Sequence, residues 1–314
     1  MKQVMLITGF LGSGKTTFLM NALKQTHCRV GVLMNEFGDI NIDSATIASE
    51  HIALKELTNG SIFCSCLKDK FIDGLIELLK QDLEMIYIES SGLADPSDMD
   101  KILKLIRRNE PELSFEFGGT LCMVDGLYFE RAYDKMVSVQ HQIKHSHQIV
   151  INKMDLINDE SYEKILRIIQ EVNPRAKITT ASYGNVDIHK LKANYFEIES
   201  EASTNTPTTR TKSMVITINQ PIINITIKDI VNMLEEVKEY FYRIKGYVAI
   251  DDQVIKIDQV GATMDIEVFR KNERRIESKA MNQIVFLASR ELASIRQISS
   301  AAKKYLGNDY KINM

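Results

Sequence analysis

The sequence predicts an α/β fold in which a P-loop NTPase domain, with a mostly parallel sheet flanked by helices, precedes a small α+β domain. Three observations predict this architecture. Residues 2–182 alternate between short apolar runs and amphipathic helical stretches. A glycine-rich turn, "GFLGSGKTT" from Gly9 to Thr17, follows the first apolar run. After a Thr/Ser-rich stretch at 200–212, a series of strand-like runs replaces the alternation.

The composition excludes several classes of protein. The 314-residue chain is 44% hydrophobic, which is enough for a sizeable core and more than one domain. A net charge of −3 predicts neither a nucleic-acid partner nor a membrane surface. The opening "MKQVMLITGF" is interpreted as a first strand rather than a signal peptide, and no apolar run approaches the roughly 18 residues of a membrane span. Because the chain also has only four cysteines, we expect a cytoplasmic protein with free thiols.

The first domain is predicted to span residues 1–199. Its apolar runs are rich in Val, Ile, Met and Leu with little alternation, as expected of a sheet covered on both faces. The expected strands are 3–8, 29–35, 85–90, 119–126, 147–153 and 177–182. The helices between them are expected at 16–26, 71–81, 96–108, 128–144 and 160–172. This regular alternation predicts a mostly parallel sheet.

The second domain is predicted to span residues 213–314, after a linker at 200–212 that has few apolar residues. A strand at 213–219 is followed by a helix at 227–240. Further strands and a final helix complete an α+β domain, with strands expected at 240–251, 253–261, 264–270 and 282–289. No internal repeat is present.

The glycine-rich turn matches the G-x-x-x-x-G-K-[ST] pattern in the context that this pattern requires, between a predicted strand and a predicted helix. Backbone N–H groups from Gly12 to Thr17 would face the phosphates of a nucleotide, helped by the helix N-terminus. Lys15 would reach the β- and γ-phosphate oxygens, and the Thr16 hydroxyl would bind Mg²⁺. The residues predicted to form this phosphate-binding loop are Gly9, Gly12, Ser13, Gly14, Lys15, Thr16 and Thr17.

A second nucleotide-binding motif follows the strand at 147–153. The run "INKMD" places Asn152, Lys153 and Asp155 in the N-K-x-D pattern of GTPases. The Asp155 carboxylate can accept hydrogen bonds from N1–H and the exocyclic amine of guanine, and a buried Asp155 would be left unpaired against adenine. Lys153 would lay its aliphatic stem over the base. The run "TTASYG" could back the base with Ala181 and Ser182.

Two acidic residues at strand ends are candidates for contacts with Mg²⁺ and the γ-phosphate. Glu89 ends the strand at 85–90, where P-loop proteins carry the acid that holds Mg²⁺. Gly92 follows, and its N–H is a candidate contact of the γ-phosphate. Glu36 comes just after the second strand, where a nucleotide-sensing loop would lie, although a solvated loop acid is the alternative for this position.

Cys64 and Cys66 stand one residue apart in "NGSIFCSCLKD". In an extended segment their side chains face the same side, so both thiolates can bind one soft cation such as Zn²⁺, Co²⁺ or Cu⁺. Glu36, water or a second subunit could supply the missing ligands. The alternative is that both thiols simply pack against the following helix. Cys28 and Cys122, in contrast, are expected to be structural.

Three histidines in "QHQIKHSHQ" raise a similar choice. His141 and His145 have the i, i+4 spacing of metal ligands on one helix face, and His147 follows. The favoured interpretation is a solvated helix end, where histidine also suits the helix dipole.

Taken together, "GFLGSGKTT", "NEFG", "ESSGLADP", "NKMDL" and "RIKGYV" resemble the CobW-type GTPases, which are relatives of UreG and HypB. The resemblance implies GTP hydrolysis coupled to delivery of a transition metal to a client metalloprotein. It also implies a metal-binding C-x-C-C motif after an Asn-Gly pair. This chain departs from that motif, because Ser61 and Phe63 occupy its first two cysteine positions. Cys64 matches the last cysteine, and Cys66 is additional.

The sequence leaves three functional hypotheses. The leading one is a GTPase that carries Zn²⁺, Co²⁺ or a similar metal, with slow intrinsic turnover because no glutamine or arginine finger is evident. The second is a GTP-dependent activator that remodels a metalloenzyme or corrinoid protein without carrying metal. The third, a small-molecule kinase, is disfavoured by the guanine-reading motif. The second domain has no evident catalytic residues and is interpreted as a client or homodimer interface.

Overall fold

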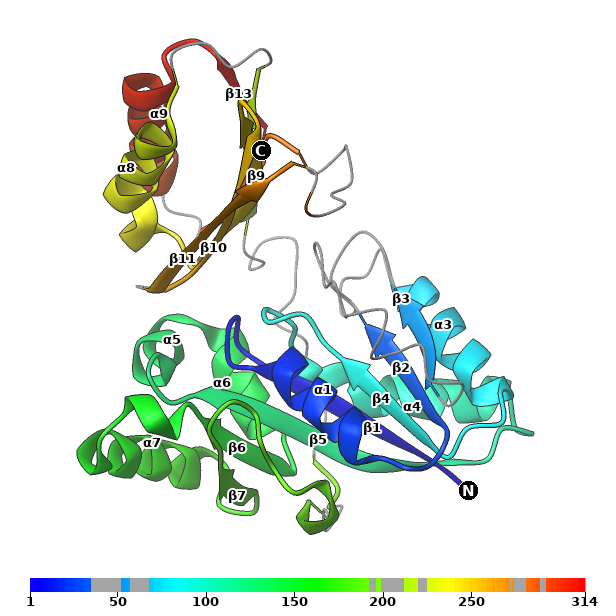
Figure 1. Ribbon diagram of the computed structural model, residues 1–314. Coiled ribbons are helices and arrows are strands. Elements are labelled where there is room, and N and C mark those ends of the chain that lie inside the picture. Colours follow the sequence, from blue (N-terminus) through cyan, green and yellow to red (C-terminus); the bar gives the residue numbers. More distant parts are fainter. Residues whose placement is uncertain are drawn as a thin grey trace. The chain divides into compact units, whose positions relative to one another are not determined.

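The computed structural model describes residues 1–34, 52–56, 68–191, 196–198, 212–219, 225–261, 263–271, 273, 281–288 and 292–313. The chain divides into two compact units, Met1–Arg210 and Thr211–Met314 (Figure 1). Most of the predicted linker lies outside the described residues. None of the helices in the described part of the chain combines the length and the apolar character that a membrane span requires.

The first unit is built on a seven-stranded sheet in the order β3-β2-β4-β1-β5-β6-β7, with every neighbouring pair parallel. The strands are β1 Lys2–Gly9, β2 Val30–Met34, β3 Ile52–Glu56, β4 Met85–Glu89, β5 Phe115–Asp125, β6 Gln148–Asn152 and β7 Lys177–Thr180. The chain leaves β1 toward β2 on one side, whereas β4 connects to β5 on the other. The strand order therefore changes direction at β1, and ligands of open α/β sheets bind beyond the carboxyl ends of the strands at such a point.

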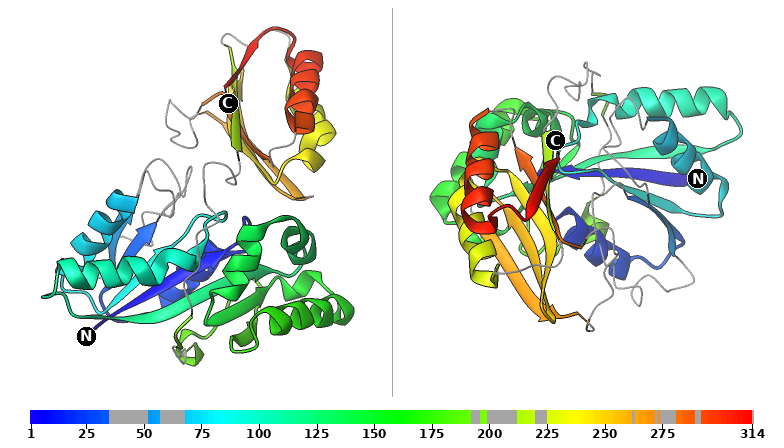
Figure 2. Two further views of the ribbon diagram at one scale, coloured as in Figure 1. Left: turned by 180° about the vertical axis from the view of Figure 1, so that it is seen from behind. Right: turned by 90° about the horizontal axis from the view of Figure 1, so that it is seen from above.

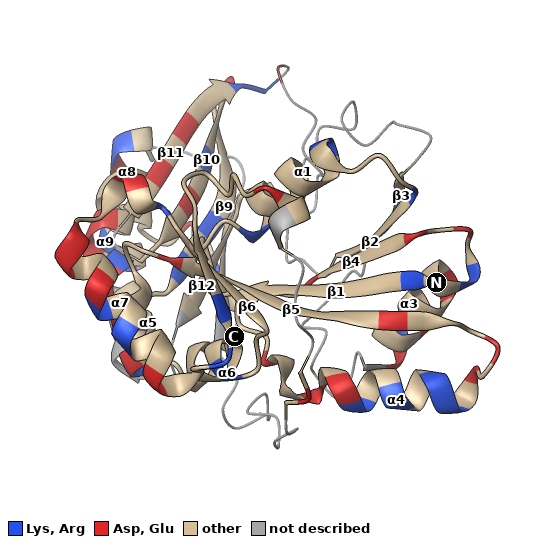
Figure 3. Ribbon diagram, turned by 90° about the horizontal axis from the view of Figure 1, so that it is seen from below, with Lys and Arg blue, Asp and Glu red and all other residues tan. Residues whose placement is uncertain are grey.

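Helices cover both faces of this sheet, as right-handed crossovers require. The helices are α1 Lys15–Gln25, α3 Lys68–Lys80, α4 Met99–Asn109, α5 Phe129–Lys135, α6 Val137–Lys144 and α7 Asp159–Val172. Helix α1 lies in front of the sheet in Figure 1, and the reverse view in Figure 2 brings α4 to the front. Two apolar cores result, one between α1 and the sheet and one beneath α3 and α4. Charged residues are frequent along α4, whereas the strands of this sheet carry few (Figure 3).

Two features of the first unit differ from the sequence-based expectation. Strand β3 was not predicted, because it is a short edge strand and two of the five residues in its sequence IALKE are charged. The helix expected at 128–144 is two helices, α5 and α6. The backbone of Met136 between them is extended, with φ −124° and ψ 106°, so it ends one helix and starts the next at a new angle.

The second unit is a six-stranded sheet in the order β11-β10-β9-β12-β8-β13, and its pairs are antiparallel. The strands are β8 Lys212–Ile218, β9 Arg243–Ile250, β10 Gln253–Val260, β11 Thr263–Arg270, β12 Gln283–Ala288 and β13 Tyr310–Asn313. Helices α8 Ile227–Val237 and α9 Leu292–Leu306 pack on one face, where Ile230, Leu234 and Ile298 enter the core. The predicted α+β class is confirmed, and β13 is an unpredicted short strand.

Candidate nucleotide-binding site

The glycine-rich loop runs from the end of β1 to the start of α1, at the carboxyl edge of the sheet. Its backbone favours glycine at three positions, because φ is +137° at Gly9, +70° at Gly12 and +96° at Gly14. A Cβ on Gly14 would also collide with the side-chain amide of Asn152. Of the amides predicted to face phosphate, that of Ser13 donates to the carbonyl oxygen of Phe10 at 3.2 Å, which closes a turn of the loop.

Lys15 begins α1 and is buried within its own loop. Its Nζ donates to the carbonyl oxygens of Gly9 and Phe10, each at 3.0 Å. These contacts hold a positive charge at the centre of the loop, although only 7% of the residue is exposed. A phosphate oxygen would offer this ammonium an anionic acceptor in place of two neutral carbonyl oxygens.

The structure brings Thr16 and Glu89 together from elements far apart in the chain. Thr16 lies in the first turn of α1 and Glu89 is the last residue of β4, yet the Thr16 hydroxyl donates to Glu89 Oε1 at 2.7 Å. Glu89 is buried beside Ile7 of β1, its partner in the sheet register. A hydroxyl and a carboxylate in contact at the end of a phosphate-binding loop form the all-oxygen set of ligands that Mg²⁺ prefers.

Gly92 packs directly against the phosphate-binding loop. A Cβ at this position would lie 2.6 Å from the backbone nitrogen of Leu11, so no larger residue fits without moving one of the two segments. The predicted γ-phosphate contact is therefore adjacent to the loop that precedes α1.

Asn152 is the first residue of the base-reading loop, residues 152–155, and joins this loop to the phosphate-binding loop. The side chain is 2% exposed, and its Nδ2 donates to the carbonyl oxygen of Ser13 at 2.9 Å. Its Oδ1 accepts from the backbone nitrogen of Gly184, also at 2.9 Å. One side chain thus connects β6, the phosphate-binding loop and the turn after β7.

Lys153 is held by a residue that the motif analysis missed. Its Nζ lies 2.7 Å from Oδ2 of Asp125, a buried carboxylate at the end of β5. The other oxygen of Asp125 accepts from the backbone nitrogen of Leu127 at 3.0 Å. The available sequence signal was an acidic residue that ends an apolar strand at the same sheet edge as Glu89, since such a carboxylate needs a partner.

Asp155 follows in a short 3₁₀ turn and is exposed, rather than buried as the specificity argument supposed. Its backbone nitrogen donates to the hydroxyl of Ser182 at 3.2 Å, and that of Met154 donates to the carbonyl oxygen of Ala181 at 3.1 Å. Ala181 and Ser182 therefore lie beside the base-reading loop.

The predicted transition-metal ligands Cys64, Cys66 and Glu36 lie outside the described residues. Within the described residues, no group of three or more His, Cys, Asp or Glu side chains is arranged to hold a metal ion. Cys122 is buried in β5, and burial raises the pKa of its thiol to about 12. Cys28 is half-buried, and burial raises the pKa of its thiol as well.

The histidines after α5 are not a solvated helix end, so that interpretation was wrong. His145 and His147 are 5% and 4% exposed. His141 Nδ1 lies 3.1 Å from Oδ2 of Asp95, which is itself fully buried. His147 Nδ1 accepts from the backbone nitrogen of Thr120 at 3.0 Å. These side chains pack α6 and the start of β6 against the rest of the unit.

A parallel sheet with a G-x-x-x-x-G-K-T loop after its first strand defines a P-loop nucleotide-binding protein. Residues 3–180 match the family described as "CobW/HypB/UreG, nucleotide-binding domain". Residues 211–298 match "Cobalamin synthesis protein cobW C-terminal domain". The chain belongs to the CobW/HypB/UreG family, and the resemblance seen in its motifs is confirmed.

Three characterised relatives show how far the similarity extends. The chain is 28% identical to "Zinc chaperone YjiA" of Escherichia coli, over 80% of this chain and 82% of the relative. It is 32% identical to "Zinc chaperone YeiR" of the same organism, over 65% of this chain and 63% of that one. It is 29% identical to "Zinc-regulated GTPase metalloprotein activator 1" of Schizosaccharomyces pombe, over 59% of this chain and 46% of that one.

Proposed function

We propose that this protein binds and hydrolyses GTP and uses the reaction to deliver a transition metal to a client metalloprotein. The observation that carries the GTPase part is the double contact of Asn152, which joins the phosphate-binding loop to the base-reading loop. A nucleotide bound there would have its phosphates at Lys15 and its base at Asp155. The metal-delivery part is supported by the names of two relatives, a "Zinc chaperone" and a "Zinc-regulated GTPase metalloprotein activator".

The proposed reaction is attack of water on the γ-phosphate, which yields GDP and inorganic phosphate. Lys15 exchanges its carbonyl partners for phosphate oxygens and stabilises the charge that develops on them. Thr16 and Glu89 are the residues that would hold Mg²⁺, which supplies further neutralisation of that charge. We expect slow intrinsic turnover that a client accelerates.

The metal is the cargo in this proposal, and Cys64, Cys66 and Glu36 are its proposed ligands. Two thiolates form half of a tetrahedral Zn²⁺ or Co²⁺ shell, and such an incomplete shell suits a carrier that must release its ion. The proposed site of action is the cytoplasm, where thiols stay reduced. The second unit is the proposed surface for the client or for a second copy of the chain. The alternative function, remodelling of a metalloenzyme without metal transfer, is supported by the word "activator" in the name of one relative.

Nucleotide specificity tests the GTPase part. Wild-type protein should bind and hydrolyse GTP in preference to ATP. Asp155→Asn should weaken GTP binding by about 10- to 100-fold, because a hydrogen bond to a charged group contributes about 1.5–3 kcal/mol. The variant should gain affinity for xanthosine triphosphate, whose carbonyl oxygen replaces the exocyclic amine and accepts from the Asn amide. The exposed Asp159→Asn, at the start of α7, is the matched control. A wild-type protein that prefers ATP contradicts the proposal.

Cobalt titration separates the metal carrier from the activator. Reduced protein is titrated with Co²⁺ in the presence of GDP or of a non-hydrolysable GTP analogue with Mg²⁺, and the thiolate-to-cobalt band is followed. We expect tighter binding with the analogue than with GDP, and loss of the band in the double variant Cys64→Ser, Cys66→Ser. Cys28→Ser is the control for a half-buried thiol elsewhere. Absence of the band, or equal affinity in both nucleotide states, supports the activator function.

A further inference from the structure

The turn that contains Gly92 is held by a side chain from a distant helix. Gln142 of α6 is 1% exposed, and its Nε2 donates to the carbonyl oxygen of Ala94 at 2.9 Å and to that of Gly92 at 3.3 Å. Its Oε1 is buried with no hydrogen-bond partner among the described residues. The amide orientation is therefore unambiguous, because reversing it would place Oε1 against two carbonyl oxygens.

A second contact from the same helix holds the end of this turn. Asp95 is fully buried and caps the 3₁₀ turn Pro96–Asp98 by accepting from the backbone nitrogen of Ser97 at 3.0 Å. The other oxygen of Asp95 lies 3.1 Å from Nδ1 of His141, the residue that precedes Gln142. The turn itself is closed by a hydrogen bond from Ala94 N to the carbonyl oxygen of Ser91 at 3.0 Å. Adjacent residues of α6 thus hold both the middle and the end of the segment 91–95.

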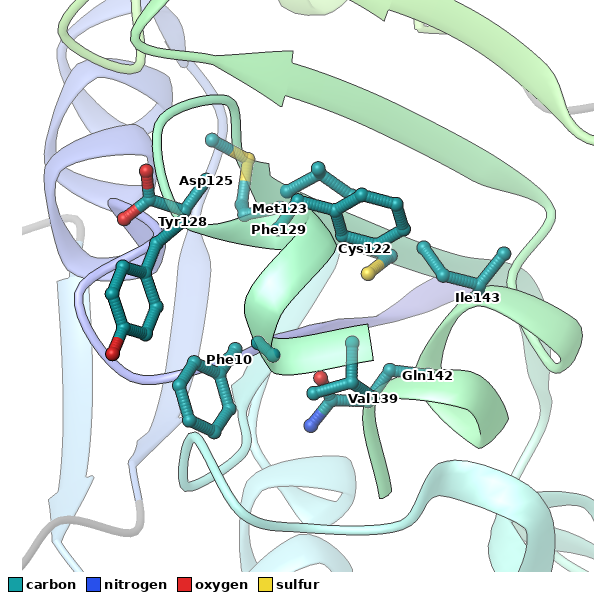
Figure 4. Close-up of a pocket in the computed structure, with 11 residues that line it drawn as sticks. Phe10, Cys122, Met123, Asp125, Tyr128, Phe129, Val139, Gln142 and Ile143 are labelled. Atoms are coloured by element: carbon teal, nitrogen blue, oxygen red, sulfur yellow. The ribbon is translucent and has the colours of Figure 1, made fainter. Parts of the chain in front are cut away.

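The C-terminal end of α6, which carries Gln142, is itself anchored to the residue that follows α7. Asn173, the residue after α7, donates from Nδ2 to the carbonyl oxygens of Ile143 at 2.9 Å and of Ser146 at 2.7 Å. The hydroxyl of Ser146 donates to the carbonyl oxygen of Gln142 at 2.6 Å. Gln142 and Phe10 of the phosphate-binding loop line the same small cavity (Figure 4). The helix is therefore a fixed support for segment 91–95, next to the phosphate-binding loop.

Glycine at position 92 makes this support necessary. Gly92 has no Cβ to restrict its backbone, and its close approach to Leu11 leaves it no side chain that could do so. One contact of Gln142 fixes the carbonyl of the peptide unit that follows Gly92, and the other fixes the carbonyl of Ala94. The Gly92 N–H, the predicted contact of the γ-phosphate, belongs to the preceding peptide unit. Gln142, 50 positions away, therefore acts on it by limiting the backbone torsion angles that Gly92 can adopt.

We propose that Gln142 is a positioning residue that sets the conformation of segment 91–95 and thereby the discrimination between GTP and GDP. The proposal rests on the proposed GTPase function and goes beyond it. It assigns to α6 the role of the support that holds this segment, through Gln142 and His141.

The test replaces the amide donor with a side chain of similar length and volume, in Gln142→Met. The matched control is Gln140→Met on the same helix, since Gln140 Nε2 donates to the carbonyl oxygen of Tyr133 at 3.0 Å, away from segment 91–95. Affinities for GDP and for a non-hydrolysable GTP analogue are measured together with kcat. In Gln142→Met, we expect analogue affinity and kcat to fall by about tenfold, the effect of one buried hydrogen bond, while GDP affinity changes less than twofold. In Gln140→Met all three values should stay within twofold of wild type.

Equal losses for GDP and the analogue, or no loss for either, overturn the positioning role. His141→Gln gives the same readout if Gln142→Met does not fold, and an unchanged analogue-to-GDP ratio in that variant again overturns it. A failure of the proposed function is a different result, because wild-type protein would then bind neither nucleotide. If wild-type protein hydrolyses GTP but the analogue-to-GDP affinity ratio is unchanged in Gln142→Met and in His141→Gln, only the positioning role is contradicted.

Discussion

At the scale of single residues, a buried carboxylate at the end of β5 forms an ion pair with a lysine of the base-reading loop. Asp125 holds Lys153 Nζ at 2.7 Å, and Lys153 itself has the strained φ of 62°. The backbone carbonyl of the neighbouring Asn152 accepts from Gly126 N at 2.9 Å, so the ends of β5 and β6 are joined twice. This arrangement keeps the aliphatic stem of Lys153 in one place, as stacking on a base requires.

Asp125→Asn should therefore weaken binding of both GTP and GDP by about tenfold, because a charge-assisted hydrogen bond that orients Lys153 is lost. The equal effect on the two nucleotides follows from the distance of the base from the γ-phosphate. Fluorescence titration with labelled GTP and GDP measures the two affinities, and the exposed Asp134→Asn on α5 is the control. Affinities that match the control for both nucleotides would show that Lys153 does not need Asp125.

His147 makes the stability of the first unit depend on pH. Burial lowers the pKa of His147 below its ordinary value, and its Nδ1 can accept from Thr120 N only while the ring is neutral. Because the unfolded chain then binds the proton more readily, stability is retained above about pH 6.5 and falls as the pH drops through the folded-state pKa. His147→Asn should be less stable than wild type at pH 8 yet lose less stability between pH 7 and pH 5.

Urea unfolding at a series of pH values measures this difference in slope. One titrating group changes the free energy of unfolding by at most about 1.4 kcal/mol per pH unit. The exposed His189→Asn should keep the wild-type slope. Identical slopes for wild type and His147→Asn would assign the pH dependence to other groups.

At the scale of elements, α8 begins with a capping box formed by Thr226 and Asp229. The hydroxyl of Thr226 accepts from Asp229 N at 3.2 Å, and Asp229 Oδ2 accepts from Thr226 N at 2.8 Å. Thr226→Ala should lower the stability of the second unit by about 1 kcal/mol. The exposed Asn232→Ala in the middle of the same helix should be neutral or stabilising, because alanine is the better helix former. Thermal unfolding compares the two variants, and equal midpoints would mean that the cap contributes nothing.

Local patterns predicted most elements, and the exceptions share a physical reason. Runs such as "MIYIES" and "HQIVINK" are apolar enough to identify β4 and β6 without knowledge of their neighbours. Strands β3 and β13 are short edge strands whose stability comes from pairing with β2 and β8, which no local pattern records. The break at Met136 is similar, because residues 128–144 are helical in composition and the bend depends on packing.

The candidate site was predictable where a motif has fixed spacing. The contact of Thr16 with Glu89 joins residues 73 positions apart, but each stands at a position that P-loop motifs specify. The roles of Asp125 and Gln142 were not predictable, since each depends on a tertiary contact with a loop from another strand. Burial of the histidines depends likewise on how α6 packs.

At the scale of the whole molecule, the two units have separate cores. The core of the second unit consists of residues between 214 and 312, whereas the cores beside the nucleotide site draw on residues between 4 and 191. The residues predicted to bind nucleotide all belong to the first unit. The binding free energy of the nucleotide is therefore linked to unfolding of the first unit only.

We therefore expect two calorimetric transitions, and nucleotide should raise the midpoint temperature of only one of them. GDP with Mg²⁺ at a hundred times the dissociation constant should stabilise the first unit by about 2.7 kcal/mol. Lys15→Ala, which removes the charge at the centre of the phosphate-binding loop, should abolish the shift and leave the other transition unchanged. Thr226→Ala should lower the midpoint temperature of the transition that GDP does not shift, and leave the other transition unchanged. A single transition that shifts as a whole with GDP would mean that the two units unfold together, and the energetic independence inferred from their separate cores would be wrong.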